Sequence, residues 1–221
     1  MNIVHATGIA GAQQAHGTVV VIDVLRSFTV SAYALAGGAR ECRLVRTVDE
    51  ARALASQTPG SVLCAEEDAM PVEGIPISNS PTLVHQLDLE GRVLIQRSTA
   101  GTQVAAAVQA VDMFAGSLVV ARATIQACLL RNPDVLTLVA SADHPEDHAC
   151  ASYMDAIARG ASVDLEQLLE PVCETERYRR VQRGDWPGFP PSDLGLALQP
   201  DVFDFAMPVT RAPEFLRLTR S

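Results

Sequence analysis

The chain alternates between short apolar runs and longer amphipathic or alanine-rich stretches. Apolar, β-branched runs of this length are typical of buried strands. They predict strands at residues 18–23, 42–45, 61–64, 92–96, 117–120 and 135–140. The intervening stretches predict helices at residues 30–36, 48–56, 80–87, 103–110 and 146–158, with one more helix between the last two strands.

Local signals mark the ends of several predicted helices. Thr47 with Glu50 three residues later predicts a capping box at the start of helix 48–56. Gly37 predicts the end of helix 30–36, because glycine commonly terminates helices. Residues 70–77 hold two prolines and a glycine, which predicts a loop.

Strands that alternate with helices at these spacings indicate an α/β fold. We expect a layered α/β/α sandwich with a largely parallel or mixed sheet, formed by residues 1–221 as a single unit. An alternative is a smaller C-terminal subdomain that begins near residue 160. Its arginine- and proline-rich segment 172–193 predicts a helix and a surface excursion, and residues 194–209 add a late strand or helix.

Composition narrows the classes of function. The 221 residues are 48% hydrophobic and 19% charged, as in a globular protein. The net charge of -9 argues against nucleic-acid binding, although a few arginines or a divalent metal can still hold a phosphate. Five scattered cysteines lack zinc-ligand spacing, and no apolar run reaches membrane-spanning length. We expect a cytoplasmic protein without nucleic-acid or membrane partners, and a homodimer is the commonest oligomer of such proteins.

Polar clusters follow four of the predicted strands, at residues 23–29, 66–68, 97–102 and 141–147. Ligands of open α/β sheets bind beyond the carboxyl ends of the strands. The convergence of these clusters therefore predicts an active site at that edge.

The first cluster combines a carboxylate with a guanidinium. Asp23 can hold Mg²⁺, and the planar fork of Arg26 suits a phosphate. Ser27 and Thr29 add hydroxyls near a helix start, where anions bind well. The alternative is that Asp23 only caps the helix. Leu25 occupies the position at which haloacid-dehalogenase phosphatases carry their second aspartate, so that arrangement is absent.

The second cluster is acidic, and a constrained loop follows it. Glu66 lies closest to the strand end and is the metal-ligand candidate, whereas Glu67 and Asp68 fit a solvated turn. Asn79 and Ser80 precede a proline, and they either bind a ligand or cap the next helix.

The third cluster is typical of an anion-binding loop. Small residues let the backbone approach an anion, and the following helix offers its N-terminus. The loop consists of Arg97, Ser98, Thr99, Ala100, Gly101 and Thr102. The alternatives are an ordinary strand-to-helix turn and, for the arginine, a structural salt bridge to an acidic residue such as Glu66 or Asp147.

The fourth cluster contains Glu146 and Asp147. Neighbouring helical residues do not face one point, so a single one of them is expected at the reaction centre. We assign Asp147 to catalysis and Glu146 to the metal. His144 and His148 are nearby candidates for a general acid.

In this order the clusters resemble those of the 2-phosphosulfolactate phosphatase family. The matching stretches are residues 20–26, 65–66, 74–81, 97–102 and 146–151. The resemblance implies an α/β fold and Mg²⁺-dependent hydrolysis of a phosphate monoester on a small sulfonated acid, as in coenzyme M biosynthesis. Two positions depart from the family pattern. Ala65 stands where glycine is frequent, and Ala100 stands where asparagine is frequent.

Two hypotheses follow. In the first, the chain is a phosphatase for a small phosphorylated acid, and Arg26 or Arg97 neutralises the phosphate. Its Mg²⁺ is held by Asp23 with one or more of Glu66, Glu146 and Asp147. Whether water or a side chain attacks stays open. In the second, the altered position 100 accompanies a loss of catalysis, and the chain binds small anions.

Overall fold

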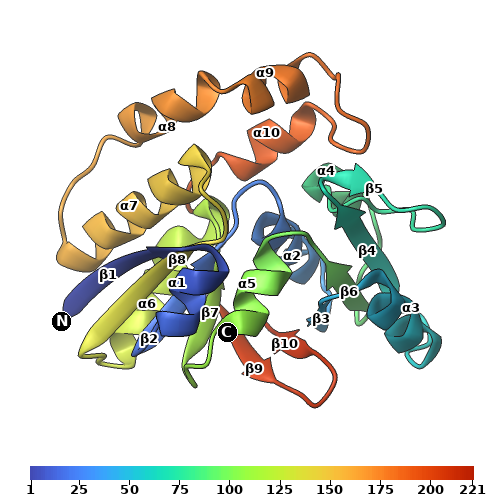
Figure 1. Ribbon diagram of the computed structural model, residues 1–221, viewed down its shortest axis with the longest axis horizontal. Coiled ribbons are helices and arrows are strands. Elements are labelled where there is room, and N and C mark those ends of the chain that lie inside the picture. The colour runs from blue at the N-terminus through green and yellow to red at the C-terminus, as the bar shows by residue number, and fades with distance from the viewer.

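The computed structural model describes residues 1–221 as one ten-stranded sheet with helices packed around it (Figure 1). The strands are β1 (Asn2–Thr7), β2 (Thr18–Ile22), β3 (Glu41–Val45), β4 (Val62–Glu67), β5 (Met70–Pro71), β6 (Val93–Arg97), β7 (Met113–Gly116), β8 (Val135–Ala140), β9 (Met207–Arg211) and β10 (Leu216–Leu218). The helices are α1 (Gly8–Gln14), α2 (Ser27–Ala36), α3 (Val48–Ser56), α4 (Pro81–His85), α5 (Gly101–Ala107), α6 (Ala121–Leu130), α7 (Pro145–Arg159), α8 (Leu165–Cys173), α9 (Glu176–Gln182) and α10 (Ser192–Ala197). None of them has both the length and the apolarity that a membrane span requires.

Two parallel groups of strands make up most of the sheet. Its order is β1-β8-β2-β7-β9-β10-β3-β6-β4-β5. Strands β1, β8, β2 and β7 run parallel, as do β3, β6 and β4. The hairpin β9–β10 joins the two groups and pairs antiparallel with both β7 and β3. The expected α/β fold with a mixed sheet is confirmed.

Sheet twist accounts for how the carboxyl ends of the two groups of strands meet at one edge. Three antiparallel steps separate them, so in a flat sheet β2 and β6 would point in opposite directions. Neighbouring strands rotate by about 20–25°, and the five steps from β2 to β6 add up to a rotation of about 100–125°. The carboxyl ends do meet, because a Cβ on Gly101 after β6 would lie 2.6 Å from Oδ2 of Asp23 after β2.

Strand β2 is buried on both faces and divides the core. Val19 and Val21 face α2 and α5, which lie between the two groups of strands (Figure 1). Val20 and Ile22 point to the opposite face, where α6 and α7 cover them. This two-sided burial explains why the strand is an uninterrupted apolar run in the sequence.

Most predicted elements are confirmed, with small shifts at their ends. Helix α3 has the predicted capping box: Thr47 Oγ1 accepts from the Glu50 N–H at 3.1 Å, and the Glu50 carboxylate accepts from the Thr47 N–H at 3.1 Å. The strand predicted at 117–120 is wrong. Strand β7 ends at Gly116, and Leu118–Val120 forms a 3₁₀ turn. Because residues 113–121 are almost continuously apolar, periodicity gives no boundary there.

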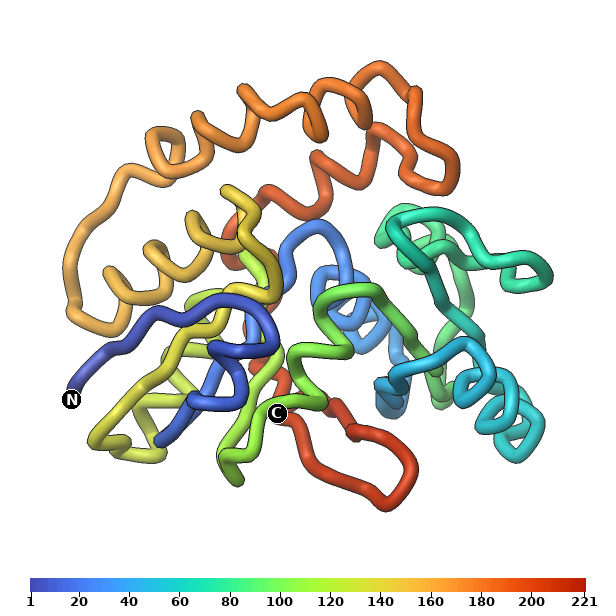
Figure 2. Tube along the Cα trace, in the orientation of Figure 1, coloured from blue at the N-terminus to red at the C-terminus, as the bar shows by residue number.

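The C-terminal helices cross from one group of strands to the other over the active-site edge (Figure 2). The crossing segment is fastened to the turn that follows β2. Arg26 Nη1 donates to the Gly188 carbonyl at 2.6 Å and to the Asp193 carboxylate at 2.9 Å. Asp193 also accepts from Ser80 Oγ at 2.7 Å. Both charged side chains of this ion pair are almost fully buried.

This anchor leads to a stability prediction. Asp193→Asn removes the negative charge and leaves the buried Arg26 guanidinium without its counter-ion. Breaking a buried ion pair from one side costs about 3–5 kcal/mol, so the midpoint of urea unfolding should fall markedly. Glu176→Gln, which removes one carboxylate from the solvent-exposed Arg183 pairs, is the matched control and should leave the midpoint unchanged. Equal midpoints for both variants would contradict the anchoring role.

Candidate active site

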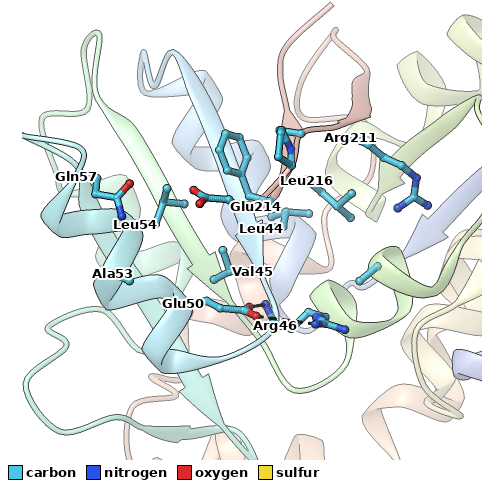
Figure 3. Close-up of a pocket in the computed structure, with 14 residues that line it drawn as sticks. Leu44, Val45, Arg46, Glu50, Ala53, Leu54, Gln57, Arg211, Glu214 and Leu216 are labelled. Carbon is cyan, nitrogen blue, oxygen red and sulfur yellow. Dashed lines mark hydrogen bonds and ion pairs between the residues drawn. The ribbon is translucent and has the colours of Figure 1, made fainter.

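One sizeable cavity of the molecule lacks the candidate chemistry. It measures about 500 Å³ and lies between α3, β3 and the β9–β10 loop (Figure 3). Leu44, Leu54 and Phe215 are among the eight hydrophobic residues of its fourteen-residue lining. Two of its four charged lining residues, Arg46 and Glu50, lie 4.0 Å apart and pair with each other. None of the predicted site residues lines it.

A smaller cavity of about 240 Å³ lies at the shared edge of the two groups of strands. All four predicted polar clusters contribute to it. Of the predicted residues, Asp23, Arg26, Glu66, Asn79, Ser98, Thr99 and Asp147 line it. Leu25, Asp68, Ala69, Ala100, Ser141, His144, Arg177 and Trp186 complete the wall.

Asp23 and Asp147 form the acidic floor of this cavity, and both are buried. Asp147 Oδ1 accepts from the Val24 N–H at 2.8 Å, so it is held against the residue that follows Asp23. Asp23 Oδ1 accepts from the Ser27 N–H at 2.9 Å. Burial raises the pKa of Asp23, and burial together with the charge of Asp23 raises the pKa of Asp147 well above its usual range. A cation at this floor would stabilise both ionised carboxylates.

The donors at the floor fit a magnesium ion that takes its other ligands from water and substrate. The Ser27 N–H engages Oδ1 of Asp23, whereas Ser141 Oγ at 3.0 Å and the Ala142 N–H at 3.4 Å donate to Oδ2 of Asp147. Oδ2 of Asp23 is therefore the freest oxygen of the floor for a metal. No three His, Cys, Asp or Glu side chains are grouped closely enough to hold a metal by themselves. Mg²⁺ commonly binds proteins through one or two carboxylates together with substrate phosphates. The floor therefore suits Mg²⁺ better than a metal that demands a full set of protein ligands.

Glu66 holds the anion loop in place. Its Oε1 accepts from the Thr99 N–H at 2.5 Å. Its Oε2 accepts from the Ala69 N–H at 2.5 Å and from Thr99 Oγ1 at 3.1 Å. These bonds link the end of β4 to the loop after β6. Metal binding by Glu66 stays a prediction, and its contacts favour a role in shaping the loop.

Arg97 does not line the cavity and makes its contacts with protein groups. It donates to the Glu66 carbonyl, to the Arg46 carbonyl at 3.3 Å and to Thr99 Oγ1 at 3.3 Å. Its Nη2 lies 3.7 Å from the Glu67 carboxylate. This resembles the structural salt bridge considered from the sequence, with Glu67 as the partner. Substrate binding by Arg97 stays a prediction.

Several other predicted residues support the cavity from outside its lining. Thr29 Oγ1 donates to the Val24 carbonyl at 2.7 Å, which closes the turn after β2. Ser80 caps α4 by accepting from the Leu83 N–H. Thr102 Oγ1 accepts from the Ser98 N–H at 3.0 Å and fixes the anion loop.

Close packing explains the glycine of the anion loop. A side chain at Gly101 would meet Asp23 at 2.6 Å and the Ser27 side chain at 2.8 Å. Glycine is therefore required for α5 to approach the acidic floor. Ser27 is fully buried beneath this contact and lies outside the cavity lining.

Arg177 is the main residue that the sequence did not single out. It comes from α9, yet its Nη1 donates to Glu146 Oε1 at 2.7 Å and its Nη2 to the Leu25 carbonyl at 2.7 Å. The guanidinium lines the cavity, whereas Glu146 does not. Metal binding by Glu146 stays a prediction, but its carboxylate is engaged by Arg177. An arginine-rich segment was the only signal, and nothing local linked it to residue 25.

Comparisons with known proteins agree with the resemblance noted in the sequence. The family model described as 2-phosphosulpholactate phosphatase matches residues 5–177. A probable 2-phosphosulfolactate phosphatase of Bacillus subtilis (strain 168) is 40% identical over 208 residues, which cover 91% of this chain and 90% of the relative. A protein of the same description from Thermoplasma acidophilum is 28% identical over 82% of this chain and 81% of its own length. The chain belongs to the 2-phosphosulfolactate phosphatase family.

Proposed function

We propose that this chain is a phosphoric monoester hydrolase that uses Mg²⁺ to release phosphate from a small (sulfo)carboxylic acid. The observation that carries the proposal is the acidic floor of Asp23 and Asp147, which faces an anion loop across one cavity. The two relatives are described as probable 2-phosphosulfolactate phosphatases, which supports the reaction and this class of substrate.

The charges around the cavity support a divalent cation. Four carboxylates line the wall, and two guanidinium groups face them. The carboxylates belong to Asp23, Glu66, Asp68 and Asp147, and the guanidinium groups to Arg26 and Arg177. Both arginines are already paired with buried carboxylates, Asp193 and Glu146. A phosphorylated acid would therefore be repelled unless a cation accompanied it.

Each part of the cavity has a separate task in this proposal. Asp23 and Asp147 would hold the ion, which neutralises phosphate charge and activates water when bound. Ser98, Thr99 and Ala100 form the loop against which the phosphate binds, and Glu66 keeps that loop in position. His144 is the imidazole in the lining and is the candidate proton donor to the leaving oxygen, and burial together with the charge of Arg177 lowers its pKa.

The first prediction of this proposal concerns phosphatase activity and its dependence on Mg²⁺. Purified protein should release phosphate from small phosphorylated acids in the presence of Mg²⁺ and should lose this activity in EDTA. Asp23→Asn should lower kcat/KM by at least about 100-fold, because a ligand of the ion is lost. Tight anion binding without turnover by the wild type would instead favour the anion-binding alternative, and a lack of turnover on a broad panel of phosphate esters would overturn the proposal.

The second prediction concerns the stability of the metal-free protein. The folded-state pKa of Asp23 lies above 3.8, so the folded protein binds more protons than the unfolded chain in the window above that value. Stability therefore falls as pH rises through this window. Asp23→Asn removes that contribution, and Asn still accepts from the Ser27 N–H. In EDTA at neutral pH the variant should melt higher than the wild type, by about 2–4 °C for each kcal/mol of relief.

Thermal unfolding in EDTA between pH 5 and pH 8 measures this effect. The control variant is Asp143→Asn, which removes an exposed carboxylate from the loop that precedes Asp147 and should leave the melting temperature unchanged. A lower melting temperature for Asp23→Asn at every pH would show that the Asp23 charge stabilises the metal-free fold, which is the opposite of the predicted effect.

The third prediction separates the two roles considered for Arg97. Arg97→Ala removes contacts to the Glu66 carbonyl and Thr99, so the loop should loosen and the melting temperature should fall. Activity should then be partly retained, with a higher KM and a smaller change in kcat, because the loop binds the phosphate less well. A loss of about two orders of magnitude in kcat/KM at unchanged stability would assign Arg97 to substrate binding. Thermal unfolding and steady-state kinetics, measured on the same variant, distinguish a structural role of Arg97 from substrate binding.

A further inference from the structure

A chain of buried polar side chains runs from α2 through β6 to the cavity. Ser31 Oγ donates to Gln96 Oε1 at 2.6 Å. Gln96 Nε2 donates to the Ser27 carbonyl at 2.7 Å and to Asn79 Oδ1 at 2.7 Å. Ser31 and Gln96 are fully buried, and Asn79 is only 3% exposed. The predicted site did not include Gln96 or Ser31.

The orientation of both amides follows from hydrogen-bonding capacity. The Ser27 carbonyl can only accept, so the Gln96 atom beside it must be the amide nitrogen. That nitrogen gives its second proton to Asn79, so the Asn79 atom facing it must be the oxygen. The Cys64 thiol, 3.7 Å from the same oxygen, is also a donor. The Asn79 NH₂ group is therefore turned away from Gln96.

This NH₂ group has no acceptor in the protein, although Asn79 lines the cavity and is almost fully buried. Helix capping does not explain the residue, because Ser80 caps α4. Asn79 also has a φ of +61°, a left-handed conformation that asparagine adopts more readily than most other residues. The NH₂ group is not among the enclosed polar atoms of the protein and opens on the cavity, so it is free to donate to an oxygen of a bound ligand.

We propose that Gln96 is a positioning residue that fixes the Asn79 amide so that its Nδ2 donates to an oxygen of the phosphate group bound in the cavity. The inference rests on the proposed function, since it names phosphate as the anion. It adds a specific donor and the side chain that holds it. If Gln96 served only to tie β6 to α2, its replacement would lower the stability of the fold and would not otherwise change the affinity for the anion.

The test exchanges the donor of Gln96 for an acceptor. In Gln96→Glu a carboxylate faces Asn79, so the Asn79 amide should rotate and present Oδ1 to the cavity. The probe is inorganic phosphate with Mg²⁺, followed by the side-chain amide resonance of Asn79 in ¹⁵N-labelled full-length protein. Asn79→Asp identifies that resonance by its loss. In the wild type the resonance should shift on phosphate addition, and in Gln96→Glu phosphate should bind at least about 10-fold more weakly.

A double-mutant cycle distinguishes positioning from structure. If Gln96 acts through Asn79, Gln96→Glu should weaken phosphate binding no further in the Asn79→Asp background. Additive losses would overturn the proposal, as would a wild-type Asn79 resonance that does not move while phosphate binds.

A second variant and a comparison with turnover complete the test. If a buried carboxylate prevents Gln96→Glu from folding, Gln96→Met leaves a side chain of similar length without a donor, and it should weaken phosphate binding in the wild type but not in Asn79→Asp. Phosphate binding that moves the Asn79 resonance in a protein without turnover would support this inference and reject the proposed phosphatase activity, so the two failures are distinguishable.

Discussion

The site depends on the burial of two like charges. Asp23 and Asp147 lie out of water on the same cavity floor, and burial raises the pKa of each. The backbone N–H groups of Val24 and Ser27 offset part of that cost, which is why the turn after β2 is so closely fixed. We propose that the remaining repulsion destabilises the metal-free protein and favours a divalent cation. In this proposal, the same two carboxylates that lower the stability of the metal-free protein are the ones that bind the ion.

The sheet and its C-terminal segment supply the frame for these charges. Twist across the β9–β10 hairpin brings the end of β6 to the end of β2, and Gly101 lets the anion loop approach the acidic floor. The segment that crosses over both groups of strands then closes the cavity. It is held by Arg26 and Asp193 at one point and by Arg177 and Glu146 at another. Arginines that could have bound a phosphate directly are thus largely committed to fastening this segment.

Local pattern predicted the parts of the fold and site that local sequence determines. The capping box at Thr47 and the polar clusters after the strands depend on a few adjacent residues, and the structure brings those clusters together. Strands β1 and β10 were missed, and β9 was anticipated only as a late strand or helix within residues 194–209, because short strands with half-exposed residues give little periodicity. Arg177 and Gln96 act through partners far away in the sequence, so no spacing rule could reveal them. The partners of Arg97 likewise emerge only from the fold, whereas its role in binding stays a prediction.

Asp23 and Asp147 are central to the proposed chemistry, because they would hold the catalytic ion between themselves and the substrate phosphate. Anomalous scattering from crystals soaked with Mn²⁺ and inorganic phosphate measures this directly. We predict one manganese peak within coordination distance of both carboxylates, with phosphate against residues 98–101. A peak bound to Glu66 or Glu146 instead, or phosphate in the cavity without a metal at the acidic floor, would contradict this role.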